Sequence, residues 1–174
     1  CTTLGLLGID KPGGMAGYVA VPADKLVRLP DAVSDKLGAL VEPVAVGMHT
    51  LRECGYLPGD SAIVIGAGAI GLIHAMLLRH FGCLNLVVAE PDPKRAGVAR
   101  KLGFTVIDST PETLEQAKAG HTGGDGFDWV LDCAGVQPVA DRLFELVRVK
   151  GTIIVVAGYK KPAALPLIQG MFKE

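Results

Sequence analysis

Three glycines with the spacing GxGxxG, namely Gly66, Gly68 and Gly71, stand where a short β-branched run gives way to an amphipathic segment. In such a turn the first glycine permits a tight bend, the second lets the backbone approach a pyrophosphate, and the third lets helix and strand pack closely. An acidic residue, Glu90, ends the next apolar run about 20 residues further on. The pattern predicts dinucleotide binding, and the competing interpretation is a strand-to-helix turn that binds nothing.

The carboxylate of Glu90 favours NAD over NADP. It can accept hydrogen bonds from both hydroxyls of an adenosine ribose, and its charge would repel a 2′-phosphate. Lys94 and Arg95 follow closely in the sequence and would weaken this discrimination, because ammonium and guanidinium groups bind phosphate. The alternative is a surface glutamate in front of a Pro-Asp-Pro turn.

Two further stretches follow predicted strands and should lie at the same edge of the sheet. Cys133 and Ala134 follow the fourth strand, and Ala157 and Gly158 end or follow the fifth. Open α/β sheets bind ligands outside the carboxyl ends of their strands, so these four residues are expected beside the cofactor, the last two near its nicotinamide half. Cys133 alone has a simpler interpretation as a small buried thiol that serves as a hydrophobic residue.

Glu42 is the one candidate metal ligand that the pattern singles out. It directly precedes Pro43, and a residue before proline avoids the α region. We therefore expect its side chain at a break in the regular secondary structure. Taken alone, a carboxylate near a helix N-terminus is the more common explanation. The histidines are scattered and are expected to be structural or exposed, namely His49, His74, His80 and His121.

The elements that must position these residues alternate regularly. Apolar β-branched runs predict strands at 62–65, 86–89, 104–107, 129–131 and 152–157. Helix-like segments lie between them at 69–81, 93–102, 111–119 and 138–149. Strands that alternate with helices of about three turns indicate a Rossmann-type, doubly wound parallel α/β sheet.

The N-terminal segment reads differently. Short strand-like runs at 18–21 and 26–29 flank a Pro-Ala-Asp turn and predict a β-rich remnant. Ser34 is placed to cap a helix that runs to residue 40, and a second helix is predicted at 43–55.

Composition narrows the class of protein. The chain has 174 residues, of which 49% are hydrophobic, and a formal net charge of -1. These values predict a globular protein with a small-molecule partner, because no basic field for nucleic acid and no basic amphipathic segment for a membrane are present. Its four cysteines have no C-x-x-C spacing and no secretory leader precedes them, so we expect a reducing cytoplasm.

Several motifs in order resemble the medium-chain zinc-dependent alcohol dehydrogenases, and in particular the branch that contains sorbitol, threonine and butanediol dehydrogenases. The resemblance covers essentially the whole chain and rests on "GGMAGYVAVPADKLVRLP", "LVEPVAVGMHTL", "PGDSAIVIGAGAIGL", "VVAEPDPKRAGVARKLG", "DWVLDCAG" and "GTIIVVAGY". It implies an NAD-dependent and zinc-dependent oxidation of a secondary alcohol or polyol, in a homo-oligomer.

The resemblance also implies roles for single residues. Glu42 would be a ligand or near-ligand of the catalytic zinc, which reverses the interpretation above, and Cys1 would be the last of four cysteines around a structural zinc. Arg95 would lie near the adenine end of the cofactor, Glu90 would bind the adenosine ribose, and Ala157 and Gly158 would lie along the nicotinamide. The pyrophosphate would be held by Gly66, Gly68, Ala69, Ile70 and Gly71.

The domain organisation implied by the resemblance is that of a fragment. Residues 1–42 would be a remnant of a GroES-like catalytic domain, and residues 43–174 an NAD-binding Rossmann domain that stops before its sixth strand. The family's zinc cysteine, its Gly-His-Glu motif and three structural cysteines do not occur in this sequence, so the chain is expected to be inactive alone. The alternatives are a zinc-free reductase of the same superfamily, a methyltransferase and a non-enzymatic NAD-binding module.

Overall fold

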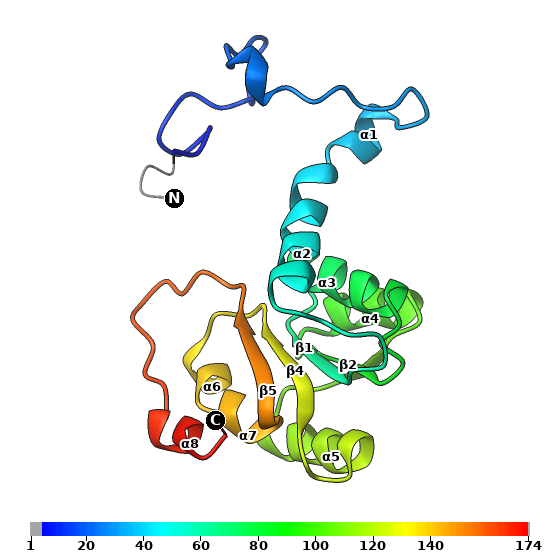
Figure 1. The fold of residues 1–174 in the computed structure, drawn as a ribbon, viewed down its shortest axis with the longest axis vertical. Coiled ribbons are helices and arrows are strands. Elements are labelled where there is room, and N and C mark those ends of the chain that lie inside the picture. Colours follow the sequence, from blue (N-terminus) through cyan, green and yellow to red (C-terminus); the bar gives the residue numbers. More distant parts are fainter. Residues whose placement is uncertain (1–4, 174) are drawn as a thin grey trace. The chain divides into compact units, whose positions relative to one another are not determined.

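The computed structural model describes residues 5–173 (Figure 1). The chain divides between Ala39 and Leu40 into two compact units.

The first unit contains little regular structure. Within residues 5–39 it forms a 3-10 turn, η1 (Ala23–Lys25), and one short helix, α1 (Asp35–Gly38). Ser34 caps α1 as predicted, since its Oγ accepts a hydrogen bond from the backbone N–H of Leu37 at 3.4 Å.

The strands predicted at 18–21 and 26–29 are wrong. Within residues 5–39 the only β pairing is an isolated bridge between Leu7 and Lys11. A strand needs a partner to form its ladder, and neither run finds one in this unit. Their apolar side chains are correspondingly exposed, with 99% of Tyr18 and 87% of Val27 accessible to solvent.

The second unit is built on a parallel sheet in the order β3-β2-β1-β4-β5. Its strands are β1 (Ala62–Ile65), β2 (Leu86–Ala89), β3 (Thr105–Ile107), β4 (Phe127–Asp132) and β5 (Val147–Val155). Its helices are α2 (Val41–Glu53), α3 (Ala69–His80), α4 (Pro93–Lys101), α5 (Pro111–Thr122), α6 (Gln137–Ala140), α7 (Leu143–Leu146) and α8 (Leu167–Met171). This confirms the doubly wound α/β fold.

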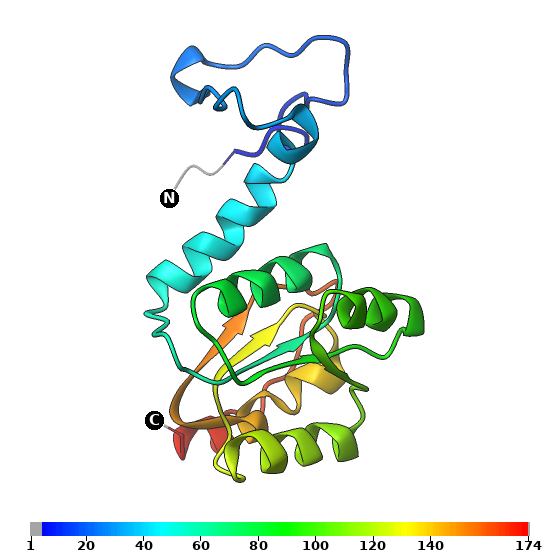
Figure 2. The ribbon, with the colours of Figure 1, turned by 90° about the vertical axis from the view of Figure 1, so that its right-hand side faces the viewer.

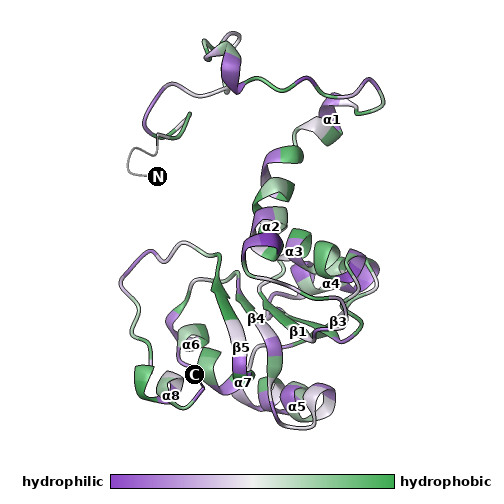
Figure 3. Ribbon diagram, in the orientation of Figure 1, coloured by the Kyte–Doolittle hydropathy of each residue, from purple (hydrophilic) through white to green (hydrophobic). Residues whose placement is uncertain are grey.

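Helices cover both faces of the sheet, with α3 and α4 on one face and α5, α6 and α7 on the other (Figure 2). Alternate residues of β1 point into the two resulting cores, Val64 into one and Ile63 and Ile65 into the other. All residues of β1 and β2 are buried, as expected for strands covered on both sides. Figure 3 shows the apolar character of the carboxyl-terminal part of β5.

Two helices begin where proline predicts. Asp92 Oδ1 accepts hydrogen bonds from the N–H groups of Lys94 and Arg95, at 3.0 and 2.9 Å, and Pro93 is the first residue of α4. Thr110 caps α5 in the same way, in front of Pro111. A proline at the first helical position loses no intrahelical hydrogen bond, which is why this signal is reliable.

Two predicted helix boundaries are corrected. The helix expected at 138–149 is instead α6 and α7, followed by the start of β5, in which Val147 pairs with Phe127. The β-branched run that begins at Val147 fits a strand better than a helix. Helix α2 begins at Val41 rather than at Pro43, so Glu42 lies within its first turn. Proline is tolerated there because the first N–H groups of a helix have no intrahelical partner.

A polar cluster joins the amino ends of β1 and β4. Asp128 Oδ2 accepts hydrogen bonds from the backbone N–H and the hydroxyl of Ser61, both at 2.7 Å, and Asp128 Oδ1 accepts one from Arg148 Nε at 2.5 Å. Burial alone would raise the pKa of Asp128, but the Ser61 hydrogen bonds and the Arg148 charge outweigh it and hold that pKa below its ordinary value. The ionised carboxylate therefore stabilises the folded state.

This cluster predicts an acid-dependent contribution to stability. A carboxyl group whose pKa is lowered on folding stabilises the folded state fully at a pH above its unfolded pKa of about 3.9. This stabilisation is lost as the pH falls through the lower pKa that the group has in the folded state. Asp128→Asn is expected to lower the free energy of unfolding by about 1–3 kcal/mol at pH 7, and by clearly less at pH 3. Urea unfolding at both pH values measures this, with Asp125→Asn, an exposed aspartate on the neighbouring turn, as the control. An equal loss at both pH values would contradict the assignment.

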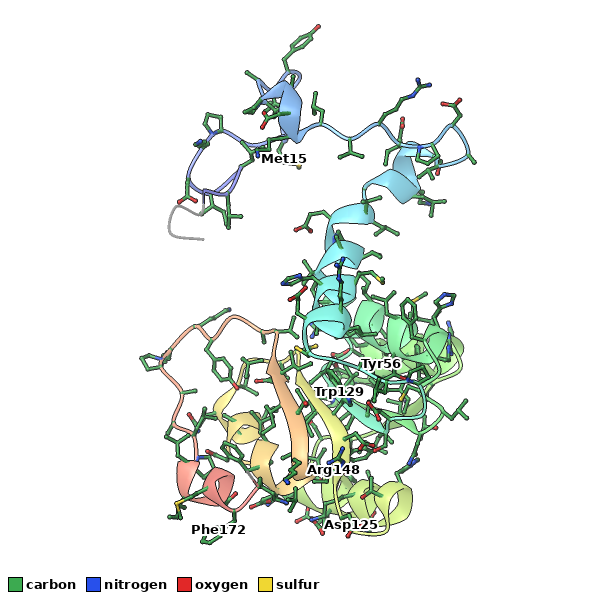
Figure 4. The ribbon with its side chains drawn as sticks, viewed as in Figure 1. Met15, Tyr56, Asp125, Trp129, Arg148 and Phe172 are labelled. Atoms are coloured by element: carbon green, nitrogen blue, oxygen red, sulfur yellow. The ribbon has the colours of Figure 1, made fainter. Side chains whose placement is uncertain are left out.

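Trp129 provides a probe for such measurements. It is 3% exposed, donates from Nε1 to Asp60 Oδ2 at 2.9 Å, and packs edge to face on Tyr56 with ring centroids 5.6 Å apart (Figure 4). It is the only tryptophan of the chain, so its emission reports the packing of this sheet.

None of the helices within residues 5–173 combines the length and the apolar character needed to cross a membrane.

Candidate functional site

The first and third glycines of the loop are required by the protein's own packing. Gly66 has φ +107°, and a Cβ there would lie 3.1 Å from the carbonyl carbon and oxygen of Cys133. A Cβ on Gly71 would lie 1.9 Å from the carbonyl oxygen of Gly66, a distance that no side chain can occupy. The loop therefore folds as the spacing predicts, with its tight turn held against the end of β4.

The second glycine is different, because nothing in the protein requires it. Gly68 is the N-cap of α3, and a Cβ there would meet no atom within 4 Å. No side chain caps α3, so the first residues of the helix, Ala69 and Ile70, present its positive end at this open space. Unpaired N–H groups and the helix dipole together favour an anion there.

Glu90 lies beside this loop rather than on the surface. It is 5% exposed, its Oε2 accepts from the N–H of Ala67 at 2.7 Å, and its Oε1 accepts from the N–H of Asp92 at 2.9 Å. The interpretation as a surface glutamate is therefore wrong. A carboxylate has about four lone-pair sites, so two acceptor positions are left after these bonds. Arg95 lies exposed in the first turn of α4, just beyond Asp92.

Cys133 behaves as a small hydrophobic residue. Its backbone N–H donates to the carbonyl of Ile65 at 2.9 Å, and its side chain packs against the buried core on the α3 side of the sheet. Burial, assisted by the nearby Asp132 charge, raises the pKa of the thiol to about 12. The thiol therefore stays protonated at neutral pH and is no nucleophile.

Two site residues escape the sequence reasoning, Asp132 and Tyr159. Asp132 is fully buried at the end of β4, where its Oδ1 accepts from the N–H groups of Ala134 and Gly135, at 2.9 and 3.0 Å. The hydroxyl of Tyr159 donates to its other oxygen, Oδ2. The signal available in the sequence was an aspartate at the carboxyl end of an otherwise apolar strand, which must find partners when it is buried.

A depression of about 510 Å³ opens at this edge of the sheet. It is lined by residues 134–137, which follow β4, and residues 158–163, which follow β5. The structure thus brings together Ala134 and Gly158 in one lining and places Ala157 next to them. The loop after β1 reaches the same edge through the contact of Gly66 with Cys133.

The residues that the structure describes do not form a zinc site. Glu42 is exposed in the first turn of α2, and within residues 5–173 no three His, Cys, Asp or Glu side chains gather as metal ligands would. A catalytic zinc takes three protein ligands. Cys1, the predicted structural ligand, lies outside the described residues.

The buried histidine is structural, as expected. His74 Nδ1 lies 2.8 Å from the carbonyl of Ile70, and its Nε2 lies 3.2 Å from Thr50 Oγ1 on α2. Burial lowers its pKa, so it stays neutral at pH 7 and joins α2 to α3.

The sheet order, the glycine loop after β1 and the acid after β2 define the Rossmann class of dinucleotide-binding folds. Comparison with known proteins then assigns the family. A family model described as zinc-binding dehydrogenase matches residues 69–174, and the chain belongs to this family. The resemblance drawn from the motifs is confirmed, and the methyltransferase alternative is excluded.

Individual relatives agree with this family. The chain is 35% identical over 162 residues to a probable diacetyl reductase [(R)-acetoin forming] of Saccharomyces cerevisiae, covering 90% of this chain and 39% of the relative. It is 30% identical to an L-threonine 3-dehydrogenase of Idiomarina loihiensis, covering 96% and 49%. The crystal structure of 2R,3R-butanediol dehydrogenase from Bacillus subtilis matches with a TM-score of 0.86 and 32% identity, covering 97% of this chain and 49% of that one. The chain thus spans about two fifths to a half of the length of these relatives.

Proposed function

We propose that this chain is the NAD-binding part of a zinc-dependent dehydrogenase that oxidises a secondary alcohol or a polyol. The observation that carries the proposal is the N-terminus of α3 at Gly68, which no side chain caps. The space beside Gly68 is open, since a Cβ there would meet no atom of the protein within 4 Å. The family match supports the reaction class. The relatives include a probable acetoin-forming diacetyl reductase, a butanediol dehydrogenase and a threonine dehydrogenase, and these names support an alcohol on a short carbon chain as substrate.

The chain's own residues would bind and orient the cofactor. Backbone N–H groups of the loop 66–71 and of the first turn of α3 would hold the pyrophosphate, and Glu90 would accept the hydroxyls of the adenosine ribose. Residues 133, 134, 157 and 158 would lie along the nicotinamide half, with Arg95 near the adenine. When bound, NAD supplies the hydride acceptor for the alcohol carbon.

The domain assignment follows the same proposal. Residues 1–42 would belong to a GroES-like catalytic domain and residues 43–174 to the cofactor domain. Glu42 would stand near a catalytic zinc whose other ligands come from a part of the protein beyond this sequence. Cys54, Cys83 and Cys133 are free thiols, which suits a reducing cytoplasm.

The proposal predicts that the chain does not turn over substrate. The purified chain, given NAD, added zinc and a panel of diols, polyols and threonine, is expected to produce no NADH above a protein-free control. The physical reason is that a single carboxylate, Glu42, cannot hold a catalytic zinc. Absorbance at the NADH band measures the reaction. Reproducible NADH formation that depends on added zinc would show that the chain is a complete enzyme.

We also propose that copies of the chain associate through β5. This strand lies at the edge of the sheet, and Val155 at its end is 52% exposed. Near its start the edge is covered, since the N–H of Lys150 donates to the carbonyl of Lys173 at 2.7 Å. The association would therefore use the part of β5 from Thr152 to Val155, because exposed strand edges recruit other chains. Sedimentation is expected to show a dimer or larger species at high protein concentration, and Val155→Lys is expected to shift it toward the monomer. A clean monomer at every concentration would rule this association out.

A further inference from the structure

The Asp132–Tyr159 contact is not among the groups proposed above to bind the cofactor. Asp132 is 0% exposed, and its carboxylate accepts three hydrogen bonds, two from backbone N–H groups and one from the Tyr159 hydroxyl. A charged group is removed from water only when it is this well partnered. The tyrosine supplies the one side-chain donor among the three.

The contact joins the segments that follow β4 and β5. The carbonyl of Asp132 accepts from the N–H groups of Val156 and Ala157, both at 3.0 Å. The two segments also touch at Gly135, which has φ +66° and whose Cβ would lie 3.0 Å from the Cβ of Ala157 and 3.1 Å from the carbonyl oxygen of Gly158. The two segments are therefore fixed to one another by these backbone hydrogen bonds and by the hydrogen bond of the Tyr159 hydroxyl to Asp132.

Tyr159 also forms part of the wall of the depression at this edge. The depression is lined by Ala134, Gly135 and Gly158, which include residues proposed to lie along the nicotinamide, and Tyr159 stands among them. Burial and the hydrogen bond to Asp132 raise the pKa of Tyr159, so its hydroxyl remains a donor throughout the neutral and mildly alkaline range.

We propose that Tyr159, held by its hydrogen bond to Asp132, is a positioning residue that shapes the seat of the nicotinamide half of the cofactor. The inference rests on the proposed function, because it needs a dinucleotide at this edge. In this proposal the loop 66–71 and Glu90 bind the adenosine diphosphate half of the cofactor, and the Asp132–Tyr159 pair orders the residues around its nicotinamide half. The pair does not touch the reacting atoms and acts through the backbone of residues 133–135 and 157–158.

The test compares two ligands that differ only at the end in question. NADH carries the nicotinamide, and ADP-ribose lacks it. Calorimetric titration of Tyr159→Phe is expected to show NADH affinity lowered about fivefold to tenfold, which corresponds to about 1–1.4 kcal/mol, and ADP-ribose affinity within about twofold of the unaltered chain. Tyr18→Phe, at a residue that is 99% exposed in the first unit, should change neither.

A second variant distinguishes loss of the Asp132–Tyr159 contact from a general loss of folding. In Asp132→Asn the amide oxygen can still accept from the two backbone N–H groups, and its NH₂ can donate to the Tyr159 oxygen, so the contact persists with its direction reversed. NADH affinity is expected to stay closer to that of the unaltered chain than in Tyr159→Phe. Equal losses for NADH and ADP-ribose in Tyr159→Phe, or no loss for either, would overturn the positioning role. Failure of the unaltered chain to bind ADP-ribose would overturn the proposed function itself, and this inference with it.

Discussion

Gly71→Ala is expected to destabilise the second unit by about 3 kcal/mol and to abolish dinucleotide binding. The added Cβ would stand 1.9 Å from the carbonyl oxygen of Gly66. That oxygen belongs to backbone, which cannot swing aside as a flexible side chain can. Relief requires that α3 move away from the loop, and this movement disrupts the turn in which the pyrophosphate would lie. Urea unfolding followed by Trp129 emission measures the first effect, and NADH titration measures the second.

Gly97→Ala is the matched control for this prediction. Gly97 lies inside α4, and a Cβ there would meet nothing within 4 Å. Alanine is favoured over glycine within a helix by about 1 kcal/mol, so this change should stabilise the chain slightly and leave NADH binding unchanged. If Gly71→Ala behaved like Gly97→Ala, the close approach of α3 to the loop would be wrong.

Glu90→Ser is expected to weaken NADH binding at least about tenfold and to narrow the difference between NADH and NADPH. Hydrogen bonds to a charged group contribute about 1.5–3 kcal/mol, and the change removes both the proposed bonds to the ribose and the repulsion of a 2′-phosphate. It also removes the acceptor for the Ala67 N–H, so the loop itself loses a support. Titration with NADH and NADPH in parallel separates the two effects, because loss of that support alone lowers both affinities by the same factor.

The control for Glu90 is an acidic residue far from the loop. Glu115 lies on α5, where it pairs with Lys118 at 2.8 Å and is 53% exposed. Glu115→Ser should leave both affinities unchanged. An unaltered ratio of NADH to NADPH affinity in Glu90→Ser would remove Glu90 from the ribose site.

The parts of the fold that sequence predicts best are those with a local physical cause. The predicted strands at 62–65 and 86–89 agree residue for residue with the structure. Short β-branched runs bounded by turn residues are typical of buried strands. The starts of α4 and α5 agree because proline and its capping residue act within one turn. The predicted strands at 18–21 and 26–29 fail because a strand is completed by a partner, which the local pattern does not contain.

In the candidate site, too, the sequence predicts the features that have a local cause and misses the contacts between distant residues. The glycine spacing and Glu90 were predictable because each glycine has its own geometric reason, which the structure shows at Gly66 and Gly71. The hydrogen bond from Ala67 to Glu90 and the contact of Tyr159 with Asp132 join residues 23 and 27 positions apart. Such contacts depend on how loops from different strands meet at the edge of the sheet, so no short sequence motif predicts them.

This chain is expected to form a dinucleotide site by itself, and the most direct test is calorimetric titration of the purified chain with NADH. Every group proposed to bind the cofactor, from Gly66 through Glu90 to Gly158, lies within the unit that begins at Leu40. The site can therefore form without any other part of the protein, and we expect saturable binding with a stoichiometry close to one NADH per chain. No saturable heat of binding up to millimolar NADH, from a chain that unfolds cooperatively in urea, would contradict the account.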